Sequence, residues 1–532
     1  MLKRIVDCGE LGDKGDSSEQ DAWKDARPTS VSIEGTIRKH VDVIFEFLRQ
    51  PGDRRSFDTV ERGLIPLLFA LGRLFIAFFL AWREEHSQVE LHAWGKKGYR
   101  LRLPQPRLVG TFFGKVRYWR TYMKEEDAGL YPLDLALGLT ADGFSMLVVS
   151  LAARLSTRMS YDQVTETLSL FLDWSPSKTT AEKTVMGLGK HTEEWFLKAP
   201  VPEDDGEVLV TQIDSKATPT ATDSELERRR GKRRKNPFPR SPRHRGRANR
   251  LRRGPKRRRK KGDKSKNGKA AHLVVQYTLK QAKGPDGMPA LLGPRNRKVY
   301  ASYVSKRHAF GMARRLADKR GFSKNSGKRH QLITDGDEHF ERLAQDFFPE
   351  AIRTLDVMHV LEYVWEAGHL LFREGSADLT RWIEKMKKLL YGGKALEMTV
   401  KIGSAHTKTP KTGPGNKHKR ERLASIRDYL LKRIDQMNYD SLRAEDLEIA
   451  SGSVEGAVNH VIALRFDKGG MRWIRERAQP LLQLRCIDLN GDWDQFITFV
   501  HQKAIAQAKE SCEAQAVLSL KPNPLSEIAE SA

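Results

Sequence analysis

The stretch HQLITDGDEHFERLAQDFF, residues 330–348, places carboxylates between a short apolar run and an amphipathic helix. The apolar run has the composition of a buried β-strand and ends at Asp335, and the residues that follow repeat at helical spacing. Asp337 and Glu338 are expected to begin that helix, because acidic residues favour the positive end of the helix dipole. Helix capping does not account for Asp335, which stands at the end of the strand before the helix begins.

The surrounding sequence predicts an α/β domain with a mixed sheet. Strand and helix patterns follow one another in the order strand, strand, strand, helix, strand, helix, strand. Three successive strands followed by alternation are typical of an antiparallel meander that continues into parallel strands through right-handed crossovers. The segments are 207–215, 271–279, 298–305, 306–320, 330–335, 338–348 and 352–357.

The rest of the chain divides by composition. Helical spacing precedes short antiparallel strands in the N-terminal region, and a helical insertion follows the first part of the α/β core. A flexible basic loop is expected at 401–420 within that insertion, and fraying is expected after Ile505. The predicted division is 1–34 (flexible), 35–125, 126–200, 205–358, 359–445, 446–500 and 501–532 (tail).

The helices predicted in 126–200 are compatible with a helix-turn-helix reader of DNA. A capping box starts at Ser160, and Ser175 is expected to cap the last helix. That last helix carries Lys178 and Lys183, which would face DNA in such a reader. The same pattern fits any small helical bundle, so both alternatives stay open.

Most of the net charge of +26 lies in one tract. Residues 228–266 contain 22 Lys or Arg residues and a single acid, Asp263. Such a segment has too little apolar surface to form a core and is expected to be disordered when unbound. It is predicted to bind DNA or RNA through salt-dependent phosphate contacts. The arginines assigned to these contacts are Arg228, Arg229, Arg230, Arg233, Arg234, Arg252, Arg253, Arg257, Arg258 and Arg259.

The spacing of the cysteines and the positions of apolar segments indicate in which cellular compartment the protein is expected. Cys8, Cys486 and Cys512 show neither zinc-ligand spacing nor a disulfide framework, which favours a reducing cytoplasm. The N-terminus lacks the apolar run of a secretory signal. The apolar segment 64–82 approaches the length of a membrane span, but Arg73 at its centre favours a buried core helix. No membrane partner is therefore expected.

Asp214 and Asp335 each stand at the end of a predicted strand. If those strands are neighbours in one sheet, the two carboxylates emerge side by side at one edge. Two unpaired acids would repel each other, and a divalent cation such as Mg²⁺ or Mn²⁺ relieves that repulsion. Two such ions support in-line phosphoryl transfer, and a carboxylate from a helix, such as that of Glu455, would complete the site. Spacing alone does not select these three from 68 acids.

Several linked motifs narrow the choice. They are RLVGTFFGKV (107–116), YPLDLALGL (131–139), TDG (334–336), FPEA (348–351), LDVMH (355–359), GSVEGAVN (452–459) and RFDKGGMRW (465–473). In their order and separation these motifs resemble an insertion-sequence transposase of the DDE class, in the Kra-type bacterial group related to Mutator-like elements. The resemblance covers about residues 98–498 and implies a ribonuclease-H-like core, shared with retroviral integrases, with a helical N-terminal region and an all-α insertion before the glutamate helix.

The resemblance also implies an activity. Asp214, Asp335 and Glu455 would be the catalytic, metal-binding triad for two Mg²⁺ or Mn²⁺ ions. The implied reaction is attack on a phosphodiester, first by water and then by a DNA 3′-hydroxyl. Terminal inverted repeats and target DNA would be the partners. Joining two ends implies a homo-oligomer, in a bacterial cytoplasm and associated with the nucleoid.

Supporting roles are expected for residues near the triad. Asp356 and His359 support the site or form a purely structural hydrogen-bonded pair. Asn459, one helical turn beyond Glu455, would orient that carboxylate or contact the DNA backbone. In the last motif, Arg465 and Arg472 would touch substrate strands, whereas Trp473 is equally consistent with a core position.

Two other functions fit the same sequence. A metal-dependent nuclease would have the same site but would not transfer strands. A catalytically idle DNA-binding regulatory protein would keep the basic tract and lack the chemistry.

Overall fold

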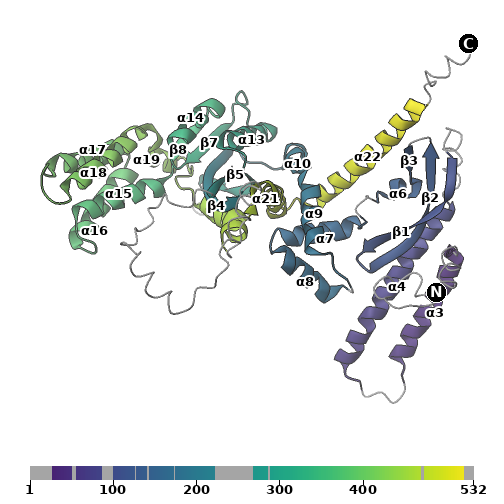
Figure 1. Ribbon diagram of the computed structural model, residues 1–532. Coiled ribbons are helices and arrows are strands. Elements are labelled where there is room, and N and C mark those ends of the chain that lie inside the picture. The colour runs from purple at the N-terminus through teal and green to yellow at the C-terminus, as the bar shows by residue number, and fades with distance from the viewer. Residues whose placement is uncertain are drawn as a thin grey trace, which may run out of the picture. The chain divides into compact units, whose positions relative to one another are not determined.

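The computed structural model describes residues 27–50, 55–86, 100–125, 128–139, 143–172, 174–221, 268–284, 288–468 and 473–519. Contacts divide the chain into two compact units, and each is described by itself. The first takes the described residues of Met1–Leu188 and Trp493–Ala532, and the second takes those of Gly189–Asp492. Figure 1 labels the elements of both.

A helical hairpin and a small sheet form one part of the first unit. α3 (Ser30–Leu48) and α4 (Phe57–His86) pack together, and α4 also lies against the sheet. The antiparallel sheet contains β1 (Arg100–Thr111), β2 (Gly114–Glu125) and β3 (Ala128–Leu130) in that order. Apolar residues of the hairpin and of β1 and β2 share one core. The predicted helices are followed by antiparallel strands, as expected, but β1 and β2 are 12 residues long each and so are not short.

Only one face of α4 is buried. Leu74, Ala77 and Leu80 pack on the sheet side, whereas Phe75 and Phe79 are exposed. Among the described residues, α4 is also the helix that is long and apolar enough to cross a membrane, by length and composition alone. The prediction of a buried core helix is therefore correct for one face of α4 and wrong for the other.

Helices make up the other part of the first unit. The capping box at the start of α8 is confirmed, because the Ser160 hydroxyl accepts from Gln163 and the Gln163 side chain accepts from Ser160. α22 packs on α6 and α7 and continues beyond the point where fraying was predicted. The elements are α6 (Pro132–Leu137), α7 (Met146–Ser156), α8 (Tyr161–Phe171), α9 (Lys178–Gly189) and α22 (Trp493–Ser519).

The predicted start of α9 is wrong by two residues. The helix begins at Lys178, and the Ser177 hydroxyl accepts a hydrogen bond from the Thr180 backbone N–H at 3.2 Å. Ser177 therefore fills the capping position that the sequence assigned to Ser175, because both serines precede a helical run and only the local backbone selects between them.

A mixed sheet forms the centre of the second unit. Its path is β6-β5-β4-β7-β8, with β4, β5 and β6 antiparallel and β7 and β8 parallel to β4. The predicted mixed sheet, three antiparallel strands followed by parallel ones, is what the structure contains. The bounds are β4 (Val208–Ala221), β5 (Gly268–Lys283), β6 (Pro289–Ser302), β7 (Arg329–Thr334) and β8 (Ile352–Leu355), and β9 (Trp473–Ile474) pairs with the end of β4.

Helices connect and cover these strands. α13 (Lys306–Lys319) joins β6 to β7, and α14 (Glu338–Phe347) joins β7 to β8, as predicted. The Asp337 carboxylate caps α14 by accepting from two backbone N–H groups, so Asp337 and Glu338 do begin that helix. α10 (Thr192–Lys198) packs on α13, and α21 (Arg475–Leu489) packs on β6.

The chain between β8 and the glutamate-bearing helix is helical. The basic loop predicted at 401–420 is wrong, because α17 and α18 cover most of it. Ile402 and Leu423 are fully buried, and burying one face of each helix outweighs the Gly- and Pro-rich composition. The helices are α15 (Val357–Leu371), α16 (Ala377–Tyr391), α17 (Ala395–Lys408), α18 (Asn416–Leu431) and α19 (Tyr439–Ala444), followed by α20 (Gly452–Ala457) and a π-helix (Val458–Asp467).

Candidate functional site

Asp214 and Asp335 lie beyond the point where two parallel strands stop pairing. The parallel pairing of β4 with β7 ends at Gln212, opposite Ile333. Asp214 and Asp335 each follow that pair by two residues. Residues two apart on a strand share a face, and opposed residues of a parallel pair share it too, so both carboxylates project to one face of the sheet.

One detail of this prediction is wrong. β7 ends just before Asp335, but β4 does not end at Asp214; it continues to Ala221 along β5. Strand length was misjudged because the antiparallel partner extends β4 beyond the end of its parallel one. The two carboxylates are still adjacent, because their positions follow from the pairing of Gln212 with Ile333 and not from where β4 ends.

Neither of these carboxylates forms an ion pair with another described residue. Asp214 accepts a hydrogen bond from the Ser215 backbone N–H, and Asp335 Oδ1 accepts from the Asp337 backbone N–H at 3.0 Å. Burial raises the pKa of Asp214, and the negative charge of Asp335 raises it further. His359 is a nearby positive charge that partly offsets this repulsion, because it lowers the pKa of Asp214, and Asp335 in turn raises the pKa of His359. Two acids this close together form an arrangement that a bound cation would stabilise further.

Asp356 follows β8, the next parallel strand, and is fully engaged. Its carboxylate accepts from the Met358 backbone N–H and from His359 Nδ1, both at 3.0 Å, and from the backbone N–H and hydroxyl of Ser451. Burial alone would raise the pKa of Asp356, but these donors outweigh it and hold the pKa below its ordinary value. The hydrogen bond to Asp356 raises the pKa of His359 to about 9. Asp356 therefore ties the start of α15 to the segment that leads into α20.

Glu455 lies near this face of the sheet but does not join the two aspartates. The segment before α20 is held there, because Gln212 Nε2 donates to the Ala450 carbonyl at 3.3 Å and Gln331 Nε2 donates to the Glu448 carbonyl at 2.6 Å. α20 itself packs on β4 and β5. Glu455 is exposed, and within the described ranges no three His, Cys, Asp or Glu side chains are grouped closely enough to hold a metal ion. The predicted triad is thus brought into one region without being assembled.

Asn459 was expected on the same face as Glu455 from α-helical spacing. The helix changes from α to π after Ala457, so the spacing that supported this expectation does not apply. In the structure Asn459 Oδ1 accepts from Lys468 Nζ at 2.6 Å.

Gly336 and Tyr429 are two residues whose part in this site the sequence did not reveal. Gly336 adopts φ 73°, and a Cβ there would lie 2.4 Å from the Tyr429 hydroxyl oxygen and 2.6 Å from a Leu355 methyl carbon. The Tyr429 hydroxyl donates to the Asp335 carbonyl at 2.7 Å. The turn after Asp335 therefore requires glycine, and the TDG motif was the signal that could have pointed to it.

The residues predicted to bind DNA differ in exposure, and several of them lie outside the described residues. Arg465 is buried, with its guanidinium carbon 4.5 Å from the centre of the Trp473 ring, so the expected contact with substrate is not available in this conformation. Lys183 is exposed on α9, and Lys178 is exposed and lies 3.4 Å from Asp162. Arg472 and all the arginines assigned within 228–266 fall outside the described residues, so their roles stay predictions.

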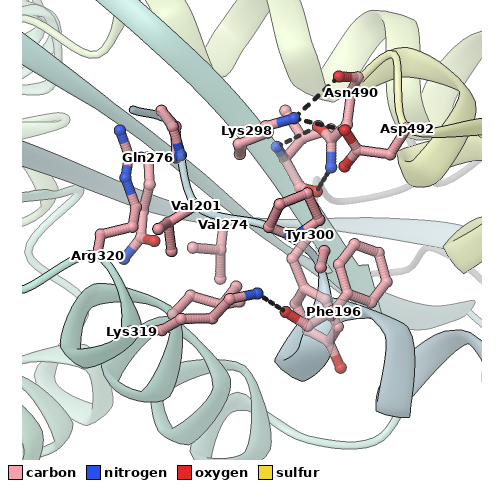
Figure 2. A pocket seen from close by; sticks show the side chains of 15 residues that line it. Phe196, Val201, Val274, Gln276, Lys298, Tyr300, Lys319, Arg320, Asn490 and Asp492 are labelled. Carbon is pink, nitrogen blue, oxygen red and sulfur yellow. Dashed lines mark hydrogen bonds and ion pairs between the residues drawn. The ribbon is translucent and has the colours of Figure 1, made fainter. Parts of the chain in front are cut away.

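A pocket lies on the opposite face of the sheet from Asp214, and several polar side chains that line it bond to other groups of the protein (Figure 2). Gln276 lines this pocket and donates to the Thr211 hydroxyl. Thr211 is three residues before Asp214 on β4, so the two side chains point to opposite faces of the sheet. Lys298 pairs with Asp492 at 2.6 Å, and Lys319 Nζ donates to the Phe196 carbonyl at 3.0 Å. Both lysines of this pocket therefore stabilise the fold.

Comparison with known proteins gives little beyond this geometry. No family model matches the chain, and no curated protein matches it. Among solved structures, a chain of the "Drosophila P element transposase strand transfer complex" is similar at 10% sequence identity, over 69% of this chain and 83% of that chain, with a TM-score of 0.23.

Proposed function

We propose that this chain is a transposase that uses divalent metal ions to cut the ends of a mobile DNA element and join them to target DNA. The observation that carries this proposal is the pair Asp214, on β4, and Asp335, directly after the neighbouring parallel strand β7, which form no ion pair with a described residue. Ligand sites of α/β sheets lie beyond the carboxyl ends of parallel strands. The order of the mixed sheet supports a ribonuclease-H-like core, the finer assignment that the motifs imply.

The donor set fits Mg²⁺ or Mn²⁺. Carboxylate oxygens are the ligands these ions prefer, and Asp214 and Asp335 would hold them, with Glu455 as the third carboxylate. Bound in a pair, such ions supply activation of the attacking oxygen and stabilisation of the leaving oxygen. The chain itself supplies Asp214 on β4 and Asp335 directly after β7, and neither forms an ion pair with a described residue.

Asp356 and Ser451 have a positioning role in this proposal. Their hydrogen bonds fix the segment immediately before α20, so Glu455 starts one helical turn from an anchored point. α20 continues as a π-helix, a rare conformation that is frequent at functional sites. We infer that Glu455 reaches the aspartates when DNA and metal are bound, since the attraction of a divalent cation would compensate for bringing three acids together.

End-joining on a labelled terminal-repeat oligonucleotide with Mg²⁺ tests this function. Wild-type protein is expected to cut the strand and to join its 3′ end to a second duplex, and Asp335→Asn is expected to do neither while it still binds. Cleavage without joining would identify a nuclease instead. The inverted repeats that flank the coding region provide the oligonucleotide.

A catalytically idle DNA-binding protein is the second candidate. The observation that favours it is the exposed position of Glu455, away from the two aspartates. Under this alternative, wild type and Asp335→Asn would bind the oligonucleotide equally well and neither would cut it, at any Mg²⁺ or Mn²⁺ concentration.

The basic tract is proposed to hold DNA without regard to sequence. Each phosphate contact by Lys or Arg releases counterions, so a tract with 22 such residues should give binding that weakens steeply with salt. Deleting residues 228–266 is expected to weaken binding to unrelated DNA and to flatten the plot of log affinity against log salt concentration. An unchanged slope would show that the tract makes no phosphate contacts.

A further inference from the structure

α4 has two apolar faces, and the first is already used within the unit. Leu74, Ala77 and Leu80 are buried in the core shared with β1 and β2. The polar groups on this side also have partners there: Arg73 Nη1 donates to the Phe113 carbonyl at 2.9 Å, and Glu84 accepts from the Thr121 backbone N–H at 2.8 Å. This face of α4 therefore packs on the sheet through apolar contacts and through hydrogen bonds from Arg73 and to Glu84.

The second face is an exposed apolar stripe, here called the seam. Its members follow spacings of three, four and seven residues, so they lie along one side of the helix. They are Ile65 (47% exposed), Leu68 (47%), Phe75 (51%), Phe79 (45%) and Trp82 (40%). The seam is about 26 Å long at 1.5 Å per residue. A groove lined in part by Val41, Phe75 and Phe78 adjoins it.

Four of the five seam residues are symmetric about the midpoint between Arg73 and Leu74. Phe75 is the exception, because it would oppose Gly72, which is buried against the Phe113 ring. If a second α4 lay antiparallel across that point, Ile65 would oppose Trp82 and Leu68 would oppose Phe79. The ends also match, because Glu61 lies four residues before Ile65 and His86 lies four residues after Trp82. An acid at one end would therefore meet an imidazole at the other, twice in each pair of helices.

We propose that α4 pairs with α4 of a second copy of this chain, antiparallel and about a two-fold axis, through the seam. A two-fold interface requires one surface patch to be complementary to itself, and the seam has both the apolar and the charge order for that. Contiguous exposed apolar patches of this kind mark interaction sites. This proposal does not depend on the proposed catalytic function, because every residue in it lies in the first unit.

A second copy fits the seam better than a lipid bilayer does. A helix that spans a bilayer exposes apolar side chains on all lipid-facing sides, whereas α4 has Arg73 and Glu84 hydrogen-bonded to the sheet on its other face. The match of Glu61 with His86 has a role only between antiparallel helices. Lipid binding and self-association are distinguished by the experiments below.

Sedimentation of the full chain tests the interface. Nuclease-treated protein in about 500 mM salt, where phosphate contacts are screened, is expected to be a dimer. Phe79→Glu should weaken the dimer at least about 100-fold, because the substitution places two buried charges in each interface. Phe171→Glu is the matched control, since Phe171 is 68% exposed on α8 of the same unit, and it should leave the dimer unchanged.

Cysteine cross-linking tests the register. In a background with Cys8→Ser and Cys512→Ser, the double variant Leu68→Cys and Phe79→Cys is expected to form a disulfide-linked dimer on mild oxidation. The two positions are about 16 Å apart along one helix, too far for a bond within one chain. Linkage by Leu68→Cys alone, with none gained from the pair, would overturn the antiparallel register.

Charge reversal tests the ends of the seam. Glu61→Lys alone and His86→Glu alone should each weaken the dimer several-fold, and the double variant should restore it. A wild-type protein that stays monomeric at 100 µM would overturn the proposal. So would a monomer that co-sediments with vesicles of phosphatidylcholine and phosphatidylglycerol, since that result would assign the seam to lipid.

Discussion

Acids stand at two places along β4, just before its start and midway along it, and the protein treats them in opposite ways. Just before the strand, Asp205 accepts from Arg320 at 2.8 and 2.6 Å and from the Thr278 hydroxyl at 2.9 Å. Burial alone would raise the pKa of Asp205, but these partners outweigh it and lower the pKa. Midway along the strand, Asp214 has a raised pKa, and neither it nor Asp335 forms an ion pair with a described residue.

This difference separates structural acids from candidate ligands. A sheet that contained acids only for stability would be expected to pair them all, as it pairs Asp205, because an unpaired and partly buried carboxylate costs stability. Keeping Asp214 and Asp335 without such partners is costly to the fold alone, because the positive charge of His359 offsets their repulsion only in part. A bound cation would account for the rest of that cost.

The largest expected effect is on catalysis. Asp214→Asn should lower DNA cleavage at least about 1,000-fold, as loss of an essential residue does. Asp204→Asn, just before the start of β4, should leave cleavage within about twofold, since Asp204 is an exposed partner of Lys280 and Arg295 whose loss changes surface charge only. Equal losses in both variants would remove the contrast between the two acidic sites.

Stability should change in the opposite order. Asp205→Asn is expected to destabilise the second unit by about 3 kcal/mol, because it leaves the nearly buried Arg320 without its carboxylate. Urea unfolding followed by tryptophan fluorescence would measure the change, with Asp204→Asn as the control. A loss below about 0.5 kcal/mol would mean that the Asp205 pair is not structural.

Asp214→Asn should stabilise the metal-free protein by about 1 kcal/mol at pH 7, because it removes a desolvated charge next to Asp335. The pKa of Asp214 is higher in the folded state than its ordinary value of 3.8, so the ionised group lowers stability as the pH rises above that value. The gain should therefore be full at pH 7 and shrink as the pH falls towards 4. Destabilisation at pH 7 would show that Asp214 has a stabilising partner.

The smallest effect concerns the Asp356–His359 pair. The pKa of His359 is raised to about 9, so the pair's contribution is fully present below pH 6.5 and is lost as the pH rises through 9. The stability difference between wild type and His359→Gln is expected to be about 1 kcal/mol at pH 6, because the histidine is partly exposed, and to vanish above pH 9.5. Thermal melts across that range would measure it, and a difference independent of pH would contradict the charged pair.

The same contrast explains what the sequence could and could not reveal. The strand order and the position of Asp335 were predictable, because the period of apolar residues is a local property. The bond between Asp356 and Ser451 joins residues 95 positions apart, and nothing local in either segment marks it. Whether an acid has a partner is a tertiary property of this kind, so the sequence could nominate Asp214 without showing that it is unpaired.

Two other errors had the same origin. The loop predicted at 401–420 is mostly helical because Ile402 and Leu423 find buried positions in the helical block, and that burial is invisible to composition. α4 was taken as a buried core helix because its apolar residues surround it. Hydropathy measures how apolar a helix is, but not which faces other elements cover.

Binding of Mn²⁺ to the full chain, followed by electron paramagnetic resonance, tests the central claim most directly. Wild type and Asp204→Asn are expected to bind the ion with equal affinity, while Asp214→Asn and Asp335→Asn should each weaken binding at least about tenfold by removing a charged oxygen ligand. Equal binding by all four proteins, or none by the wild type with or without terminal-repeat DNA, would contradict the account.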